Sequence, residues 1–549
     1  MEQSFNTLLK DSILKNWELA AVTDFKGATH QYKDLARKIA KNHILFEAAG
    51  VEKGDKIANC GRNSANWAIA FISTVTYGAV AVPILNDFKP DNIHHITTHS
   101  DSKLMFVTDQ VWENLNDTQM PLLKAAISLL NSKLLLVRDP KIVEAREHLN
   151  ELFGKKYPNR FTQEDVVYHE DSPEELMLIN YTSGSTGFSK GVMIPYRSIW
   201  SNARYCLDNL KFLEAGDKII SMLPMAHMYG LAIEVIHPLA KGCHIHFLTR
   251  TPSPKIIMDA FAEVKPKLIV AVPLIIEKII KTRVFPLLER PLVKLMLHVP
   301  FLDQQLLSKV KAKLYETFGG ELQEMIIGGA AVNKEVEGFL RRIEFPFTVG
   351  YGMTECGPLI SYAPWDVTKP TSCGRVVDRM QVRVNSTDPQ NIVGEIHVKG
   401  TNVMLGYYKN EEANKQVFLE DGWMNTGDMG VVDEDNFIFL RGRSKNMILG
   451  ASGQNIYPEE IEDQLNNMPY VAESIVVDKD GKLVALIYPD FDAIDREGIP
   501  HDQIQDKMEE NRVALNPQLP SYSQISSTKI YYEEFEKTPK RSIKRYLYQ

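Results

Sequence analysis

Cysteine is scarce in this chain of 549 residues, which has only Cys60, Cys206, Cys243, Cys356 and Cys373. The number is odd and no two of them form a CxxC pair, which argues against a disulfide framework or a zinc site and favours a reducing compartment. No run of about 18 apolar residues occurs, so a membrane-spanning helix is not expected. The first residues also lack the uninterrupted apolar stretch of a signal peptide. We therefore expect a cytoplasmic protein.

An excess of positive charge is also missing. The chain has 62 Lys and Arg against 70 Asp and Glu, a net charge of −8, so no overall basic field attracts nucleic acid. Neither an internal repeat nor a low-complexity segment is present. With 44% hydrophobic and 24% charged residues, the composition is that of a globular protein, long enough for two or three domains.

Short apolar runs alternate with helical patterns over roughly the first 440 residues. Strands are predicted at 55–60, 80–85, 103–109, 133–139, 218–224, 243–248, 267–272 and 324–329, and a helix at 63–79. This alternation predicts an α/β body with parallel or mixed sheets that helices cover.

The pattern changes after Arg443. Residues 455–465 predict a helix with Pro458 in its first turn, and residues 473–489 predict a hairpin that turns at Asp480-Gly481. We expect a small α+β domain, joined through "RGRSKN" (441–446) to the large α/β domain. The boundary is placed between a domain of residues 1–444 and one of residues 445–549.

A loop of glycines and hydroxyl residues, "TSGSTGFSKG" (182–191), is the clearest chemical signal. Its backbone N–H groups can converge on an anion, and its hydroxyls and Lys190 add donors that suit a phosphate. It differs from a GxxxxGK[ST] loop, because Lys190 follows Gly187 by three positions and no Ser or Thr comes next. The flanking runs 175–180 and 191–196 predict strands, which places the loop at a hairpin tip. Composition alone leaves a mobile surface loop as the alternative.

Further motifs follow in order: "LPMAHMYG" (223–230), "GGAA" (328–331), "VGYGMTE" (349–355), "GWMNTGDMG" (422–430), "RGRSKNMILGASGQNIYPEEIE" (441–462) and "TPKRSIKR" (538–545). With the loop, they resemble the adenylate-forming superfamily of acyl-CoA synthetases, luciferases and nonribosomal-peptide adenylation domains, over about residues 25–549. The resemblance implies that a carboxylate and Mg·ATP form an acyl-adenylate and pyrophosphate. Most members then pass the acyl group to a thiol.

The resemblance also implies where the nucleotide binds. The β- and γ-phosphates would lie on Thr182, Ser183, Gly184, Ser185, Thr186, Gly187 and Lys190; the adenine on Gly329, Ala330, Ala331, Tyr351 and Gly352; the α-phosphate on Thr354; and the ribose on Asp428 and Arg443. Glu355, together with Thr186, would hold Mg²⁺, which prefers oxygen ligands. Taken alone, Glu355 and Asp428 are equally ordinary loop acids, and Tyr351 an ordinary core residue.

Catalytic roles are implied for four residues: Thr186, Glu355, His227 and Lys544. His227 would stand between the acyl carboxylate and the thiol tunnel. Lys544 would offset the charge that builds up during adenylation, although Ile543 stands where the family usually has Gly. Lys445 matches the hinge about which the small domain swings, and Gly453 would line the pantetheine tunnel in the second pose.

The substrate is less well defined. Residues 275–314 are apolar and rich in Lys and Arg, and they could wall an acyl tunnel, lie on a membrane as a peripheral contact, or form core-facing helices. The residues of the motifs "ASGQNIYPEEIE" and "TPKRSIKR" favour a fatty acid as substrate, of long chain in preference to short. The resemblance implies ATP, Mg²⁺ and CoA as cofactors. An enzyme that loads an acyl carrier protein or activates an aryl acid, and a catalytically inactive sensor, are the alternatives. The sequence does not indicate an oligomeric state.

Overall fold

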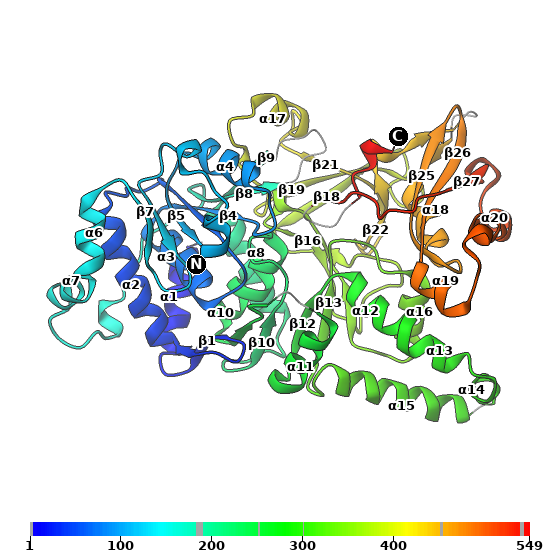
Figure 1. Ribbon diagram of the computed structural model, residues 1–549, viewed down its shortest axis with the longest axis horizontal. Coiled ribbons are helices and arrows are strands. Elements are labelled where there is room, and N and C mark those ends of the chain that lie inside the picture. Colours follow the sequence, from blue (N-terminus) through cyan, green and yellow to red (C-terminus); the bar gives the residue numbers. More distant parts are fainter. Residues whose placement is uncertain are drawn as a thin grey trace.

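The computed structural model describes residues 4–182, 190–250, 253–299, 301–450, 454–538 and 543–548. A large α/β domain comes first, and a small α+β domain follows at the C-terminal end (Figure 1). The predicted fold class is therefore confirmed. In the described part of the chain no helix has the length and apolar character needed to cross a membrane.

Two large sheets form the body of the first domain. One has the strand order β20-β9-β8-β4-β3-β5-β6-β7. Its strands are β3 Lys56–Cys60, β4 Val80–Ile84, β5 Ser102–Val107, β6 Ala125–Ser128, β7 Leu134–Val137, β8 Leu176–Thr182, β9 Lys190–Pro195 and β20 Gly406–Tyr407. The other has the order β14-β13-β12-β10-β11-β1-β2. It consists of β1 Ala20–Asp24, β2 Thr29–Gln31, β10 Lys218–Ser221, β11 His244–Phe247, β12 Leu268–Ala271, β13 Glu324–Ile327 and β14 Phe347–Val349.

Every strand predicted above for the large domain lies in one of these sheets, with its ends displaced by one to three residues. The neighbouring strands are mostly parallel, as β12, β13 and β14 are. Such strands are covered on both faces, which explains why they are continuous apolar runs instead of alternating ones. The predicted helix 63–79 is α3, Ala65–Tyr77, which begins where the Ser64 side chain accepts from the Trp67 N–H and ends at Gly78 with a φ of 88°.

Helices cover the sheets of the large domain (Figure 1). They are α1 Phe5–Lys15, α2 Tyr32–Ala48, α3, α4 Pro90–His99, α5 Asp109–Trp112, α6 Pro140–Glu147, α7 Leu149–Lys156, α8 Tyr196–Asn209, α9 Met228–Gly230, α10 His237–Lys241, α11 Pro254–Val264, α12 Pro273–Ile279, α13 Phe285–Leu288, α14 Pro291–Met296, α15 Leu302–Thr317, α16 Lys334–Arg342 and α17 Glu411–Val417. Two small antiparallel sheets complete this domain. They contain β15 Tyr351–Gly352, β16 Leu359–Tyr362 and β17 Arg375–Val376, and β18 Met380–Asn385, β19 Gly394–Gly400, β21 Met424–Val432 and β22 Ile438–Arg443.

The small domain has its own cores. One hydrophobic cluster runs through the large domain from Phe5 to Ile438, and two separate clusters lie beyond residue 455. The small domain contains β23 Ile448–Leu449, β24 Asn455–Ile456, α18 Pro458–Leu465, β25 Val471–Lys479, β26 Lys482–Pro489, α19 Phe491–Glu497, α20 Ile504–Leu515 and β27 Ser527–Ile530. The boundary between residues 444 and 445 stays a prediction.

The hairpin predicted at 473–489 is confirmed as β25 and β26, and Asp480 and Gly481 both have the positive φ that its tight turn requires. The helix predicted at 455–465 is present, but its predicted first residue is wrong. Asn455 and Ile456 form β24, which pairs with β23, and α18 begins at Pro458. Proline at the first helical position explains the true start, because its missing N–H has no partner there in any case.

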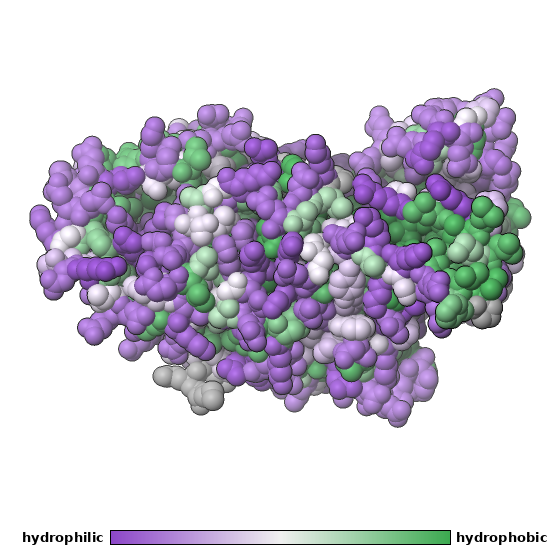
Figure 2. Space-filling view, turned by 90° about the horizontal axis from the view of Figure 1, so that it is seen from below, coloured by the Kyte–Doolittle hydropathy of each residue, from purple (hydrophilic) through white to green (hydrophobic). Residues whose placement is uncertain are grey.

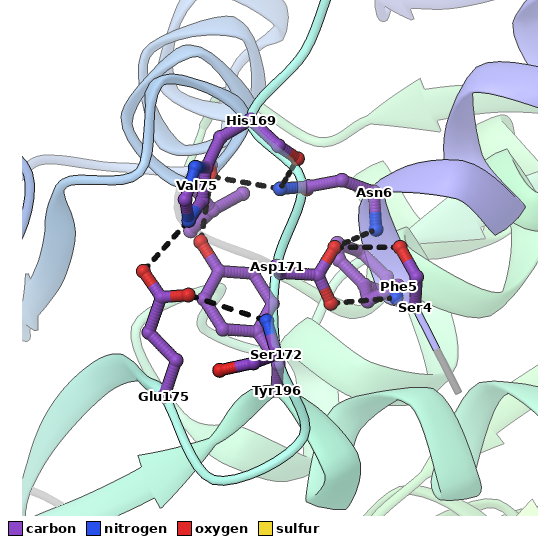
Figure 3. Close-up of polar contacts among 9 residues, drawn as sticks. All are labelled: Ser4, Phe5, Asn6, Val75, His169, Asp171, Ser172, Glu175 and Tyr196. Carbon is purple, nitrogen blue, oxygen red and sulfur yellow. Dashed lines mark hydrogen bonds and ion pairs between the residues drawn. The ribbon is translucent and has the colours of Figure 1, made fainter. Parts of the chain in front are cut away.

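A polar cluster ties the N-terminal helix to the segment that leads into β8 (Figure 3). Asp171 accepts from the Ser4 hydroxyl at 2.7 Å and from the N–H groups of Phe5 and Asn6 at 3.0 Å each. A carboxylate at the start of α1 also interacts favourably with the helix dipole. The Asn6 side chain donates to the carbonyls of Val75 and His169. The start of β8, which leads to the glycine-rich loop, is thereby fixed against α1 and α3.

Candidate nucleotide and carboxylate site

The glycine-rich loop joins two paired strands, as predicted. β8 and β9 are antiparallel, and Thr182 is opposite Lys190 at their ends. Ser183, Gly184, Ser185, Thr186 and Gly187 lie outside the described residues, so their predicted roles stay predictions. The Lys190 Nζ lies 4.9 Å from the centre of the Tyr407 ring, which is a cation–π distance.

Tyr407 connects Lys190 to Glu355. It belongs to β20, which pairs with β9, and its hydroxyl donates to Glu355 Oε1 at 2.9 Å. The backbone of Glu355 is fixed as well, because its carbonyl accepts from the Met404 N–H. Sequence reasoning missed Tyr407, since "GYY" has no motif of its own and its partners are far away in the chain.

The predicted ribose pair lies on two adjacent strands. Asp428 of β21 is directly opposite Arg443 of β22. Asp428 Oδ1 lies 2.8 Å from Arg443 Nε, and Oδ2 accepts from the Tyr351 hydroxyl at 2.6 Å. Burial raises the pKa of Asp428, while the Arg443 charge and the Tyr351 hydrogen bond act in the opposite direction. The structure thus brings three predicted residues into one hydrogen-bonded group.

Lys445 follows this pair in the turn 444–446. Partial desolvation, followed by the positive charges of Arg443 and Lys190, lowers its pKa. Lys190, Arg443 and Lys445 thus form a cluster of cations beside the carboxylates of Asp428 and Glu459, whose charges act in the opposite direction. Cations gathered in this way can bind an anion.

The predicted adenine-binding residues lie at the end of β13. Gly329, Ala330 and Ala331 are exposed, and Gly329 has a φ of 86° with open space where a side chain would point. Gly352 is exposed too, whereas Thr354 is buried. An exposed main chain after a parallel strand, at the carboxyl edge of a sheet, is a usual place for a nucleotide.

One cavity, open to solvent, adjoins these residues. It is lined by predicted residues, namely His227, Gly329, Tyr351, Gly352 and Thr354, and by apolar side chains that include Cys206, Leu210, Met228, Ile233 and Met353. Gly328 and Tyr229 pack closely in its wall, because a Cβ on Gly328 would come within 2.9 Å of the Tyr229 ring. The walls are predominantly apolar, so the cavity suits a hydrocarbon group.

Lys544 does not join this group in the structure. Its Nζ forms an ion pair with Glu536, and its N–H donates to the Glu536 carbonyl at 2.8 Å, so both contacts lie within the small domain. Gly453, the predicted tunnel residue, lies outside the described residues.

Glu324 is a buried acid behind the cavity that sequence reasoning did not single out. Its Oε2 accepts from the hydroxyl of Tyr362, a cavity-lining residue, at 2.5 Å, and its Oε1 accepts from the Trp365 N–H at 2.8 Å. Burial raises the pKa of Glu324 to about 7 in spite of both hydrogen bonds. A group of this kind makes the stability of the fold depend on pH.

We expect Glu324→Gln to remove part of that pH dependence. Because the pKa of about 7 in the folded state lies above the ordinary value of 4.5, the folded state binds more protons between these values, and the free energy of unfolding falls as pH rises through this window. The loss is on the order of 3 kcal/mol, complete by about pH 8. Glutamine cannot ionise, so the stability of the variant relative to wild type should rise by that amount from pH 4.5 to 8, as measured by urea unfolding.

The matched control is Glu420→Gln, which alters an exposed glutamate after α17. Its stability relative to wild type should stay constant over the same pH range. If the Glu324→Gln difference were equally constant, the pKa of the Glu324 carboxyl would be the same in the folded and unfolded states, which would contradict the prediction.

The two-domain fold and this group of residues define an adenylate-forming enzyme. The family described as AMP-binding enzyme matches residues 10–408, so the chain belongs to that family. The matched range contains Lys190, His227 and Glu355 and ends before Asp428. The resemblance inferred from the motifs is thus confirmed.

Named relatives are long-chain-fatty-acid–CoA ligases. ACSBG2 of Gallus gallus is 26% identical over 533 residues, covering 91% of this chain and 68% of the relative. FadD15 of Mycobacterium bovis is 27% identical over 473 residues, covering 81% of this chain and 74% of the relative. The chain therefore spans about two thirds to three quarters of their length. The chain is thus an AMP-binding enzyme that is similar to acid–thiol ligases.

Among solved structures, ATP-bound MatB from Rhodopseudomonas palustris has the same fold. Its TM-score is 0.77 at 22% identity, and the comparison covers 100% of this chain and 98% of that one. The agreement extends over both domains of the described chain.

Proposed function

We propose that the protein activates a fatty acid, of long chain in preference to short, with ATP and transfers the acyl group to CoA. The observation that carries the proposal is the cavity with apolar walls that opens beside Tyr351, which is itself bonded to Asp428 of the cationic site. An acid with a hydrocarbon tail fits the cavity while its carboxylate faces the nucleotide. The names of the relatives point to the same substrate class.

In the first half-reaction a carboxylate oxygen attacks the α-phosphorus of ATP, forming a C–O–P anhydride and releasing pyrophosphate. Both reactants are anions, so the protein must supply positive charge and alignment. Lys190 and Lys445 face the phosphates, Asp428 accepts from the ribose hydroxyls, and Arg443 pairs with Asp428 and orients it. Thr182 and Thr354 hold the phosphate chain at its two ends.

Mg²⁺ fits the donors of this site. Glu355 offers a carboxylate oxygen whose position Tyr407 fixes, and oxygen is the ligand that this hard cation prefers. Glu355, and Thr186 in the predicted loop, would hold the ion. When bound, Mg²⁺ would neutralise phosphate charge as pyrophosphate leaves.

In the second half-reaction the sulfur of CoA attacks the acyl carbonyl carbon, a thioester forms, and AMP leaves. Lys544 serves only the first half-reaction, so the small domain must bring it to the carboxylate and then remove it. His227 borders the cavity and stands between the carboxylate and the approaching thiol. The loop that contains Gly453 lines the path of the thiol in the second pose.

A panel of carboxylic acids with ATP and CoA tests the proposal. AMP, pyrophosphate and an acyl-CoA should form together, and kcat/KM should rise with the length of a saturated fatty acid, because each buried methylene contributes about 0.8 kcal/mol. Aryl acids of similar size are the control and should react poorly. ATP–pyrophosphate exchange without any CoA thioester would favour loading of a carrier protein and would contradict the transfer to CoA.

A further inference from the structure

Large apolar side chains are exposed at one end of the large domain. We call this surface the apolar tip; it consists of Leu287, Leu292, Leu295, Met296, Val299, Phe301 and Leu302. Leu292 is 78%, Phe301 69% and Leu295 66% exposed. Figure 2 shows a hydrophobic surface at the end of the molecule where α13 and α14 lie in Figure 1. A contiguous surface of this kind on a folded protein marks an interaction site.

The exposure results from how α14 is placed. Leu292, Leu295 and Met296 share one face of this helix at the spacing i, i+3, i+4, and that face is exposed. Leu288 and Leu297, by contrast, pack against the core of the large domain. The segment is therefore anchored from inside and presents its outer leucines to the surroundings.

Positive charge is concentrated around the tip. Residues 275–314 contain eight Lys and Arg against three acids, whereas the whole chain has a net charge of −8. Arg283, Arg290 and Lys294 are exposed, and in the described ranges no carboxylate lies within ion-pair distance of them. The local charge is thus opposite in sign to that of the chain.

We propose that the apolar tip and these cations bind the surface of an anionic lipid bilayer. The apolar side chains would enter the boundary between headgroups and acyl chains, and the cations would lie on the lipid phosphates. The excess of positive charge favours an anionic lipid surface over a second copy of the chain, which would bring the same cations to the interface. The inference is independent of the substrate proposed above, because its test measures lipid binding alone.

Sedimentation with vesicles tests the proposal on the whole chain. Wild type should bind vesicles of equimolar phosphatidylcholine and phosphatidylglycerol more tightly than vesicles of phosphatidylcholine alone. The difference should shrink in 1 M salt, where the screening length is ~3 Å. Arg290→Glu with Lys294→Glu should weaken binding to the anionic vesicles at least ~10-fold, because each cation near such a surface contributes roughly fivefold. Leu292→Asp with Leu295→Asp should do the same.

Matched controls use residues far from the tip. Leu130→Asp alters a leucine that is 74% exposed, and Lys155→Glu alters an exposed lysine of α7; neither should change vesicle binding. Thermal unfolding verifies that each variant is folded. Wild-type binding that is equal on both vesicle types, or tip variants that bind like wild type, would overturn the proposal. So would self-association that the tip variants abolish while vesicle binding is absent.

Discussion

Asp428→Ala should raise the KM and the Kd for ATP at least about 100-fold while leaving the protein folded. In the proposed function the carboxylate accepts from both ribose hydroxyls, and a hydrogen bond to a charged group is worth about 1.5–3 kcal/mol. Losing two such bonds costs about 3 kcal/mol or more, which corresponds to the stated factor. The replacement also leaves Arg443 and the Tyr351 hydroxyl without the acceptor that they share.

Calorimetric titration with ATP and acid-dependent ATP–pyrophosphate exchange measure this effect. Asp428→Asn should lie between wild type and Asp428→Ala, because the amide oxygen still accepts one hydrogen bond. Asp433→Ala is the matched control: it removes a carboxylate just after the same strand, one that pairs with Lys369, and should leave ATP affinity unchanged. Unaltered ATP binding by the folded Asp428→Ala protein would contradict the assignment of Asp428 to the ribose.

Elements with strong local signals could be predicted from the sequence. The helix α3 has a serine cap, an apolar body and a glycine stop, and the β25–β26 hairpin has an Asp-Gly turn, so short-range interactions determine both. The predicted start of α18 at residue 455 is wrong because Asn455 and Ile456 pair with β23. A short stretch of sequence does not show with which strand it pairs.

Some residues of the candidate site could likewise be predicted from motifs, and others could not. Asp428 and Arg443 lie in motifs only 15 residues apart, and the structure places them opposite each other on adjacent strands. Tyr407 and Glu324 have no motif, and their contacts with Glu355 and Tyr362 depend on the tertiary fold. Residues 275–314 show most clearly what the sequence cannot predict, namely which apolar residues are buried. Ile276, Ile280 and Leu314 face the core, but the leucines of α14 do not, and an apolar pattern alone cannot distinguish the two.

Lys544→Ala should reduce the first half-reaction on the order of 1,000-fold and change thioester formation from a supplied acyl-adenylate by less than about twofold. In the proposed function the ammonium group offsets charge that develops only while the carboxylate attacks phosphorus, so its loss should affect kcat more than substrate binding. In the structure its Nζ is held by Glu536 of the small domain, and the proposed function has that domain move to bring the lysine to the carboxylate. Glu536→Gln frees the lysine from this ion pair and should leave the first half-reaction at least as fast as in wild type.

The two half-reactions must be measured separately, by acid-dependent ATP–pyrophosphate exchange and by CoA-dependent release of AMP from the acyl-adenylate. Lys482→Ala, an exposed lysine of β26, is the matched control and should alter neither rate. A Lys544→Ala protein that loses both half-reactions equally would have a general defect in fold or binding, and one that keeps both would show that another group offsets the charge. Selective loss of the first half-reaction is the result that distinguishes a lysine delivered by domain motion from a basic residue with only a structural role, whose loss would affect both steps or neither.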